Sequence, residues 1–155
     1  MLKWNVSKIL ALLFLCWGIQ ASQAKSIKDA RQEIIRSTMD YLSIPYLWGG
    51  TNPQTGLDCS GFVQLVFHRA GLPVPRVARD QFSTTYYLDP KSVLPGDLIF
   101  FSMKNPSSRR VDHVGIYVGK SFFVHASVSN GIHIDQVMNP YYYERIVGIR
   151  KYTGF

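Results

Sequence analysis

The sequence predicts an α+β domain in which helices come first and an antiparallel β-sheet follows. The chain has 155 residues, about the length of one domain. Hydrophobic residues make up 46% of it and charged residues only 17%, which provides a core and excludes a disordered or low-complexity chain. Apolar residues recur at helical spacing in the first half of the chain and in short β-like runs in the second half.

Residues 1–24 have the three parts of a secretory signal. Lys3 and Lys8 give a positive start without an acidic residue, an apolar stretch covers residues 9–19, and a small-residue run ends at Ala24. The apolar stretch is about half of the roughly 20 residues that a membrane-spanning helix needs. We therefore expect cleavage after Ala24 and export to a periplasm or to the medium, with no membrane anchor left on the mature chain.

Cleavage would leave residues 25–155, which we expect to form a single domain. A lipid anchor on Cys16 is disfavoured, because Leu15 stands where a lipoprotein signal has a small residue. Once Cys16 is removed, Cys59 is the only cysteine of the mature chain. Exported proteins normally use cysteines in pairs, so a single thiol indicates a reactive role, although free cysteines also occur as inert core residues.

The elements follow in order along the mature chain. Apolar periodicity predicts helices over residues 27–42 and 59–70, and the Gly- and Pro-rich segment 45–57 between them predicts a loop. Pro95-Gly96 then turns the chain into short strands separated by Gly-rich or polar turns. The predicted strands are Asp97–Ser102, Val111–Val118, Phe122–Ser127, Gly131–Asp135 and Ile146–Tyr152.

Cys59 lies in the first turn of the second predicted helix, directly after Asp58, which is a preferred N-cap residue. The helix dipole favours a thiolate there, so we expect a thiol pKa below the free value of about 8.5. His68 points to the opposite side and is excluded as a partner. The apolar residues that share the face of Cys59 are Phe62, Val63, Val66, Phe67 and Ala70. This face must pack on the sheet, so the thiol is directed toward the strands.

Two strand histidines are candidate partners for the thiol, because a thiol nucleophile needs a base and a third group that orients the base. A three-residue hairpin loop, Gly119-Lys120-Ser121, places His113 and His125 on one face as diagonal neighbours. A two-residue loop would place them on opposite faces. His133 lies in the alternating run 131–135, and we expect it to face solvent.

Four sequence blocks in order resemble the motifs of the NlpC-type cell-wall cysteine peptidases. The blocks are Pro45–Gly50 (PYLWGG), Asp58–Val63 (DCSGFV), Leu94–Phe101 (LPGDLIFF) and Asp112–Gly119 (DHVGIYVG), and Val124–Ser127 (VHAS) follows them. The resemblance implies a papain-like fold, with no cofactor and no metal. It also implies cleavage of peptidoglycan stem peptides between γ-D-glutamate and a diamino acid, commonly meso-diaminopimelate.

The resemblance assigns a role to each matching position. Cys59 is the nucleophile, His113 is the general base and then the acid, and His125 is the polar group that orients it. The hydroxyl of Tyr46 assists the oxyanion site beside the backbone N–H of Cys59. Preorganised donors of this kind are worth roughly 3 kcal/mol each.

Some further positions could either contact substrate or support the fold, and others have only a structural role. Asp58 and Ser60 either contact the free amino end of the stem peptide or only cap the helix. We expect Arg76 and Gln81 to be structural and Tyr141–Tyr143 to serve packing.

The net charge of +7 is scattered along the chain, so nucleic acid is not an expected partner. We expect a monomer that acts on stem peptides. The alternatives are a papain-like amidase or acyltransferase, a non-catalytic wall-binding module, and a zinc protein with ligands Cys59, His113 and His125. Acyl-transferring relatives often have histidine before cysteine, whereas here the cysteine comes first.

Overall fold

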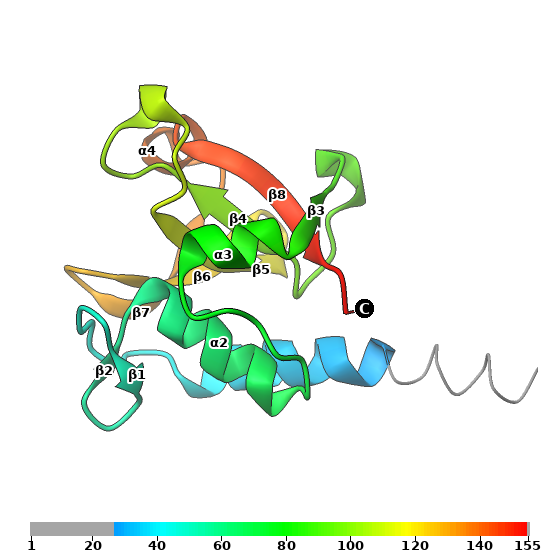
Figure 1. The fold of residues 1–155 in the computed structure, drawn as a ribbon, viewed down its shortest axis with the longest axis vertical. Coiled ribbons are helices and arrows are strands. Elements are labelled where there is room, and N and C mark those ends of the chain that lie inside the picture. Colours follow the sequence, from blue (N-terminus) through cyan, green and yellow to red (C-terminus); the bar gives the residue numbers. More distant parts are fainter. Residues whose placement is uncertain (1–26, 155) are drawn as a thin grey trace, which may run out of the picture.

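The computed structural model describes residues 27–154, with helices on both sides of an antiparallel sheet (Figure 1). The predicted signal peptide and Cys16 lie outside the described residues. Within this range, no helix is long and apolar enough to cross a membrane.

Four helices are described. The first covers residues 27–40, close to the predicted range, and the second, α2 (Cys59–Arg69), also agrees with its prediction. Two short helices were not predicted, α3 (Ala78–Ser83) and α4 (Pro140–Tyr143), because neither is long enough to show a full apolar period. Single 3₁₀ turns cover Pro90–Ser92 and Pro106–Ser108.

The main sheet has six strands in the order β3-β8-β4-β5-β6-β7, and all its paired strands are antiparallel. Its strands are β3 (Thr85–Tyr87), β4 (Leu98–Phe101), β5 (His113–Gly119), β6 (Phe122–Ser127), β7 (Gly131–Gln136) and β8 (Ile146–Tyr152). The five predicted strands are confirmed to within two residues at each end, whereas the short edge strand β3 was missed. A separate hairpin, β1 (Thr51–Asn52) and β2 (Gly56–Leu57), lies inside the predicted loop.

Both faces of the sheet are covered, as the four consecutive buried residues of β4 show. Leu98 and Phe100 join the core that includes the buried residues of α2, whereas Ile99 and Phe101 join a smaller cluster with Tyr142 of α4. Figure 1 shows α2 and the first helix together on one side of the sheet and α4 on the other. The α+β prediction is confirmed, with the N-terminal end of α2 against β5 and β6.

The β5–β6 hairpin has the predicted strand register, but its loop is shorter than predicted and a β-bulge makes up the difference. Its loop has two residues, Lys120 and Ser121, which both have positive φ, instead of the predicted three. A bulge between Tyr117 and Gly119 supplies the extra residue and restores the pairing of Ile116 with Val124. The predicted common face for the two histidines is therefore correct, although the predicted loop length is wrong.

Candidate active site

The thiol of Cys59 is held at the N-terminus of α2. Asp58 caps the helix by accepting a hydrogen bond from the amide of Gly61 at 2.7 Å. The face that begins with Cys59 continues through Phe62, which is completely buried against the sheet. This packing brings the thiol of Cys59, a residue that is 9% exposed, to the start of β5 beside the amide of Val114.

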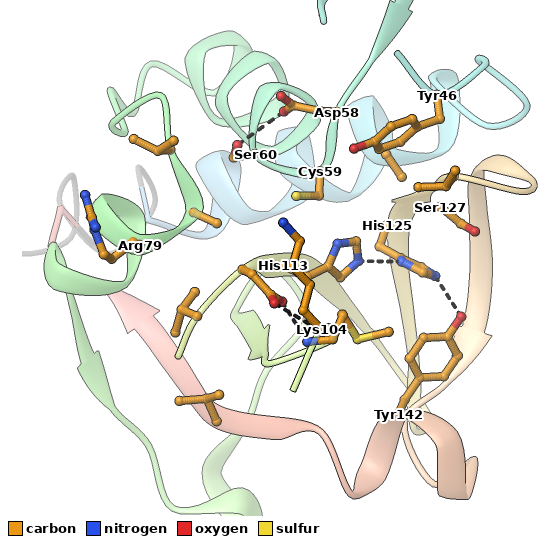
Figure 2. Close-up of a pocket in the computed structure, with 18 of the residues that line it drawn as sticks. Tyr46, Asp58, Cys59, Ser60, Arg79, Lys104, His113, His125, Ser127 and Tyr142 are labelled. Atoms are coloured by element: carbon orange, nitrogen blue, oxygen red, sulfur yellow. Dashed lines mark hydrogen bonds between the residues drawn. The ribbon is translucent and has the colours of Figure 1, made fainter. Parts of the chain in front are cut away.

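His113 and His125 form a direct pair beside this thiol. His113 Nε2 lies 2.7 Å from His125 Nδ1, and the rings meet at 89°. Figure 2 shows Cys59 next to the His113 ring, with the other ring nitrogen, Nδ1, on the Cys59 side. The structure thus brings together the three residues that the sequence predicted as the reactive set.

The chain of polar contacts continues beyond His125 to Asp135, which sequence reasoning missed. Asp135 Oδ2 lies 3.0 Å from His125 Nε2, 2.7 Å from His133 Nε2 and 2.7 Å from the hydroxyl of Tyr142. The prediction that His133 faces solvent is wrong, because its side chain is 24% exposed and its ring packs against that of His125. These contacts could have been found from the sequence by pairing residues 131–135 with the strand of His125, since His125 lies opposite His133.

Burial keeps both imidazoles neutral. It lowers the pKa of His113 to about 3, and a positive charge on His125 or His133, when either is protonated, acts in the same direction. Burial lowers the pKa of His125 to about 4, against the opposing effect of Asp135. At neutral pH the site therefore contains uncharged rings that can accept a proton.

Burial also decides the state of the thiol. It raises the pKa of Cys59 to about 11, and the charge of Asp58 adds to this rise. The amides of Val114 and Ser60 lower the pKa but do not compensate for burial. The expectation of a low thiol pKa is therefore wrong, and the free site pairs a thiol with a neutral imidazole.

Tyr46 stands beside the thiol on the wall of the site. Its backbone forms an isolated bridge with Leu57, and its hydroxyl points toward the side where Cys59 lies (Figure 2). Burial raises the pKa of Tyr46, and negative charge on Cys59, when it is ionised, and on Asp58 raises it further. The hydroxyl therefore keeps its proton and can donate a hydrogen bond.

Asp58 and Ser60 are tied together by Arg76. The guanidinium donates to Asp58 Oδ1 at 2.9 Å and Oδ2 at 2.7 Å, and to Ser60 Oγ at 3.0 Å. Burial alone would raise the pKa of Asp58, but the hydrogen bonds from Arg76 and Gly61 outweigh it and lower the pKa. Asp58 is thus an ionised cap, and the expected structural role of Arg76 is supported by these contacts.

Gln81 locks the segment that follows α2. Its side chain is fully buried, and Nε2 donates to the carbonyl oxygens of Ser60 at 3.0 Å and Pro75 at 2.8 Å. These bonds hold α3 against the start of α2 and agree with the structural role expected for Gln81.

An open cleft of about 1140 Å³ is lined by Tyr46, Asp58, Cys59, Ser60, His113, His125 and Tyr142. Its rim carries four basic side chains, Arg79, Lys104, Arg109 and Arg110. Lys104 Nζ lies 5.5 Å from the ring centroid of Trp48, which is 78% exposed. Of the three consecutive tyrosines expected to pack, only Tyr142 is buried, whereas Tyr141 lies exposed at the cleft.

One group among the described residues has the spacing of metal ligands. The donor atoms of His125, His133 and Asp135 lie within 4.8 Å of one another. Asp135 is already hydrogen-bonded to His125 and lies 2.7 Å from His133 Nε2, and this group differs from the trio of Cys59, His113 and His125 that the sequence offered for zinc.

The model of the NlpC/P60 family matches residues 43–151, which include the thiol, both histidines and Tyr46. This chain belongs to the NlpC/P60 family. It is 36% identical over 127 residues to the bifunctional muramidase/DL-endopeptidase CwlT of Bacillus subtilis (strain 168), covering 82% of this chain and 38% of that protein. It is 35% identical over 122 residues to the gamma-DL-glutamyl hydrolase of the same organism, covering 78% of this chain and 29% of that protein.

The fold is also that of the family. A crystal structure of an NLP/P60 lipoprotein-like protein from Staphylococcus aureus superposes with a TM-score of 0.72 at 34% identity, covering 79% of this chain and 41% of that chain. The papain-like fold expected from the sequence is confirmed. This chain spans less than two fifths of the length of either Bacillus relative.

Proposed function

We propose that this protein is a cysteine endopeptidase that cleaves peptidoglycan stem peptides between γ-D-glutamate and a diamino acid, commonly meso-diaminopimelate. The observation that carries the proposal is the buried thiol of Cys59 at a helix N-terminus in front of the hydrogen-bonded pair His113 and His125. Two relatives are named for a DL-endopeptidase and a gamma-DL-glutamyl hydrolase, which supports a γ-D-glutamyl bond.

The reaction begins with a proton transfer, because the free thiol is neutral. His113 Nδ1 takes the thiol proton as Cys59 Sγ forms a bond to the scissile carbonyl carbon. The carbonyl oxygen becomes an oxyanion, which accepts hydrogen bonds from the Cys59 amide and the Tyr46 hydroxyl. His125 holds the His113 ring in place through the contact of 2.7 Å.

The second half of the reaction returns that proton. His113 donates it to the nitrogen of the leaving diamino acid as the C–N bond breaks, which leaves an acyl-thioester on Cys59. His113 then takes a proton from water, whose oxygen forms a bond to the thioester carbon. The C–S bond breaks, the γ-D-glutamyl product leaves as a carboxylic acid, and His113 returns the proton to Cys59 Sγ.

The charge of the cleft supports a carboxylate-bearing substrate. A γ-linkage leaves the α-carboxylate of glutamate free beside the scissile bond. The cleft acids are already engaged, since Asp58 pairs with Arg76, and Asp112 accepts from the amides of Met103 at 2.6 Å and Lys104 at 3.0 Å. The basic rim therefore attracts an anionic peptide.

The same rim favours a second candidate substrate, a γ-linked polyglutamate. Such a polymer has a free carboxylate on every residue, and one relative is named as a gamma-DL-glutamyl hydrolase. Both candidates share the γ-glutamyl bond and differ in the residue that leaves.

Mass spectrometry of digests separates these candidates. Purified protein is incubated with stem peptides that have a free L-alanine end, with muropeptides in which the sugar is still attached to L-alanine and, separately, with γ-linked polyglutamate. We expect release of L-alanyl-γ-D-glutamate from the stem peptides, and no product with the Cys59→Ala variant. Cleavage only at the amide between sugar and L-alanine would contradict the endopeptidase proposal, and cleavage of the polymer alone would favour the second candidate.

A further inference from the structure

We propose that Asp135 is a positioning residue that sets the tautomers of His125 and His113, so that His113 Nδ1 is left free to take the proton of Cys59. The role in turnover rests on the proposed function, whereas the tautomers are a property of the folded protein without substrate.

The sheet places Asp135 behind His125. His133 lies directly opposite His125 across the β6–β7 pair, and Asp135, two residues further along β7, projects from the same face. The side chain of His125 is 2% exposed and that of Asp135 is 24% exposed, so the contact between them is largely shielded from solvent. A carboxylate oxygen 3.0 Å from a buried ring nitrogen is placed to select which nitrogen holds the proton.

The position of the proton on each histidine ring follows from the hydrogen bonds along the chain from Asp135 to His125 and then to His113. Burial alone would raise the pKa of Asp135, but hydrogen bonds from Tyr142 and His125 outweigh it and lower the pKa, so the carboxylate is ionised and can only accept. His125 must therefore have its proton on Nε2. A neutral His125 then presents bare Nδ1, which accepts from Nε2–H of His113 at 2.7 Å.

The last link of this chain is the reactive one. A neutral His113 with its proton on Nε2 has a bare Nδ1, and that nitrogen is on the Cys59 side (Figure 2). With the opposite tautomers, His113 Nδ1 would already carry a hydrogen and could not accept the thiol proton. When His113 becomes charged, the carboxylate of Asp135 also offsets the new positive charge.

Tyr142 makes the proposal testable in a specific way. Its hydroxyl donates to Asp135 Oδ2 at 2.7 Å and lies 3.4 Å from His125 Nε2. If Asp135 is removed, this hydroxyl loses its acceptor and can donate to His125 Nε2. That bond would stabilise the opposite tautomer of His125 and, through it, the unreactive tautomer of His113.

Nitrogen NMR of ¹⁵N-histidine-labelled protein at neutral pH measures the tautomers without substrate. We expect His113 and His125 both to carry the proton on Nε2, and His125 to shift to Nδ1–H in Asp135→Ala. The variant Asp135→Asn keeps an acceptor oxygen and should retain the Nε2–H form. A wild-type His125 with its proton on Nδ1, or an unchanged tautomer in Asp135→Ala, would overturn the proposal.

Kinetics on the muropeptide measures the consequence. We expect kcat of Asp135→Ala to fall about 10- to 100-fold with KM within about twofold, and Asp135→Asn to lose less. Adding Tyr142→Phe to Asp135→Ala should restore part of kcat, because the competing donor is removed. A matched control is Asp89→Ala, since Asp89 is an exposed cap that accepts from the Lys91 amide at 2.8 Å, and it should leave kcat and tautomers unchanged.

The outcomes separate the two proposals. A loss of melting temperature in Asp135→Ala with kcat per folded molecule unchanged would overturn the positioning role. Wild-type protein that has the expected tautomers but cleaves no muropeptide would support the role of Asp135 and contradict the proposed function.

Discussion

At the scale of single residues, the reactivity of Cys59 depends on opposing effects on its pKa. A helix N-terminus favours an anion by about 0.3–1 kcal/mol at exposed sites. Burial acts in the opposite direction and raises the pKa of the thiol to about 11. Burial has the larger effect on the pKa, so the site relies on His113 as a base during the reaction and not on a thiolate in the free enzyme.

Alkylation of the chain from residue 25 onward, where Cys59 is the only thiol, tests this conclusion. We expect the iodoacetamide rate to keep rising with pH above 8.5, because the raised thiol pKa puts the thiolate population there. His113→Ala should move the profile to lower pH, since the smaller side chain admits water to the sulfur. A rate that is already constant near pH 6 and moves to higher pH in His113→Ala would instead indicate a resting ion pair.

At the scale of elements, the β5–β6 hairpin sets the distance between the two histidines. Gly115 lies where a Cβ atom would be 2.7 Å from Phe123 Cδ2, 3.0 Å from the carbonyl oxygen of Val124 and 3.2 Å from His125 Cβ. Because real Cβ atoms do not approach this closely, only glycine at this position lets the strand that carries His125 come so near. The bulge next to the hairpin turn then aligns His125 with His113.

We expect Gly115→Ala to lower kcat about 10- to 100-fold, because the added methyl group pushes His125 away from His113 and small displacements are costly in catalysis. Activity on muropeptides and thermal melting are measured together. Gly148→Ala is the matched control on β8, where a Cβ atom would lie 3.5 Å from its nearest neighbour. Wild-type kcat in Gly115→Ala would show that the hairpin spacing is unimportant.

At the scale of the whole molecule, the site lies where the helical layer meets the sheet. The first helix is joined to the sheet layer by an ion pair between Arg31 and Asp97 at 2.8 Å, and the Asp97 side chain is 1% exposed. Asp97 also accepts from the Leu94 amide at 2.8 Å. Packing on both faces of the sheet buries His125 and half-buries His113, and this burial makes the stability of the fold depend on pH.

We expect the free energy of unfolding to fall on acidification. The folded pKa values of His113 and His125 lie below the ordinary value of 6.5, so the unfolded chain binds protons that the folded one does not as the pH drops below 6.5. Between pH 7 and pH 5 each histidine should cost about 2 kcal/mol. Urea unfolding at both pH values measures this, and His125→Gln should reduce the difference; equal stability at both pH values would contradict the prediction.

The main strands and α2 were predictable because their signals are local. Apolar periodicity and turn residues are properties of adjacent positions, and they located five strands and the helix that begins at Cys59. The helix geometry alone directed Cys59 toward the strands and excluded His68, which is exposed in the fold. The common face of His113 and His125 was also predictable from alternation along two neighbouring strands, with a bulge in place of the longer loop.

Features that depend on distant segments were not predictable in this way. Asp135 and Tyr142 reach His125 only through the pairing of β6 with β7 and the packing of α4. The short elements that help build the cleft have too few residues for a period. Finally, the pKa of Cys59 was predicted in the wrong direction, because a helix end is visible in the sequence, whereas desolvation is the sum of all the atoms that packing brings around the sulfur.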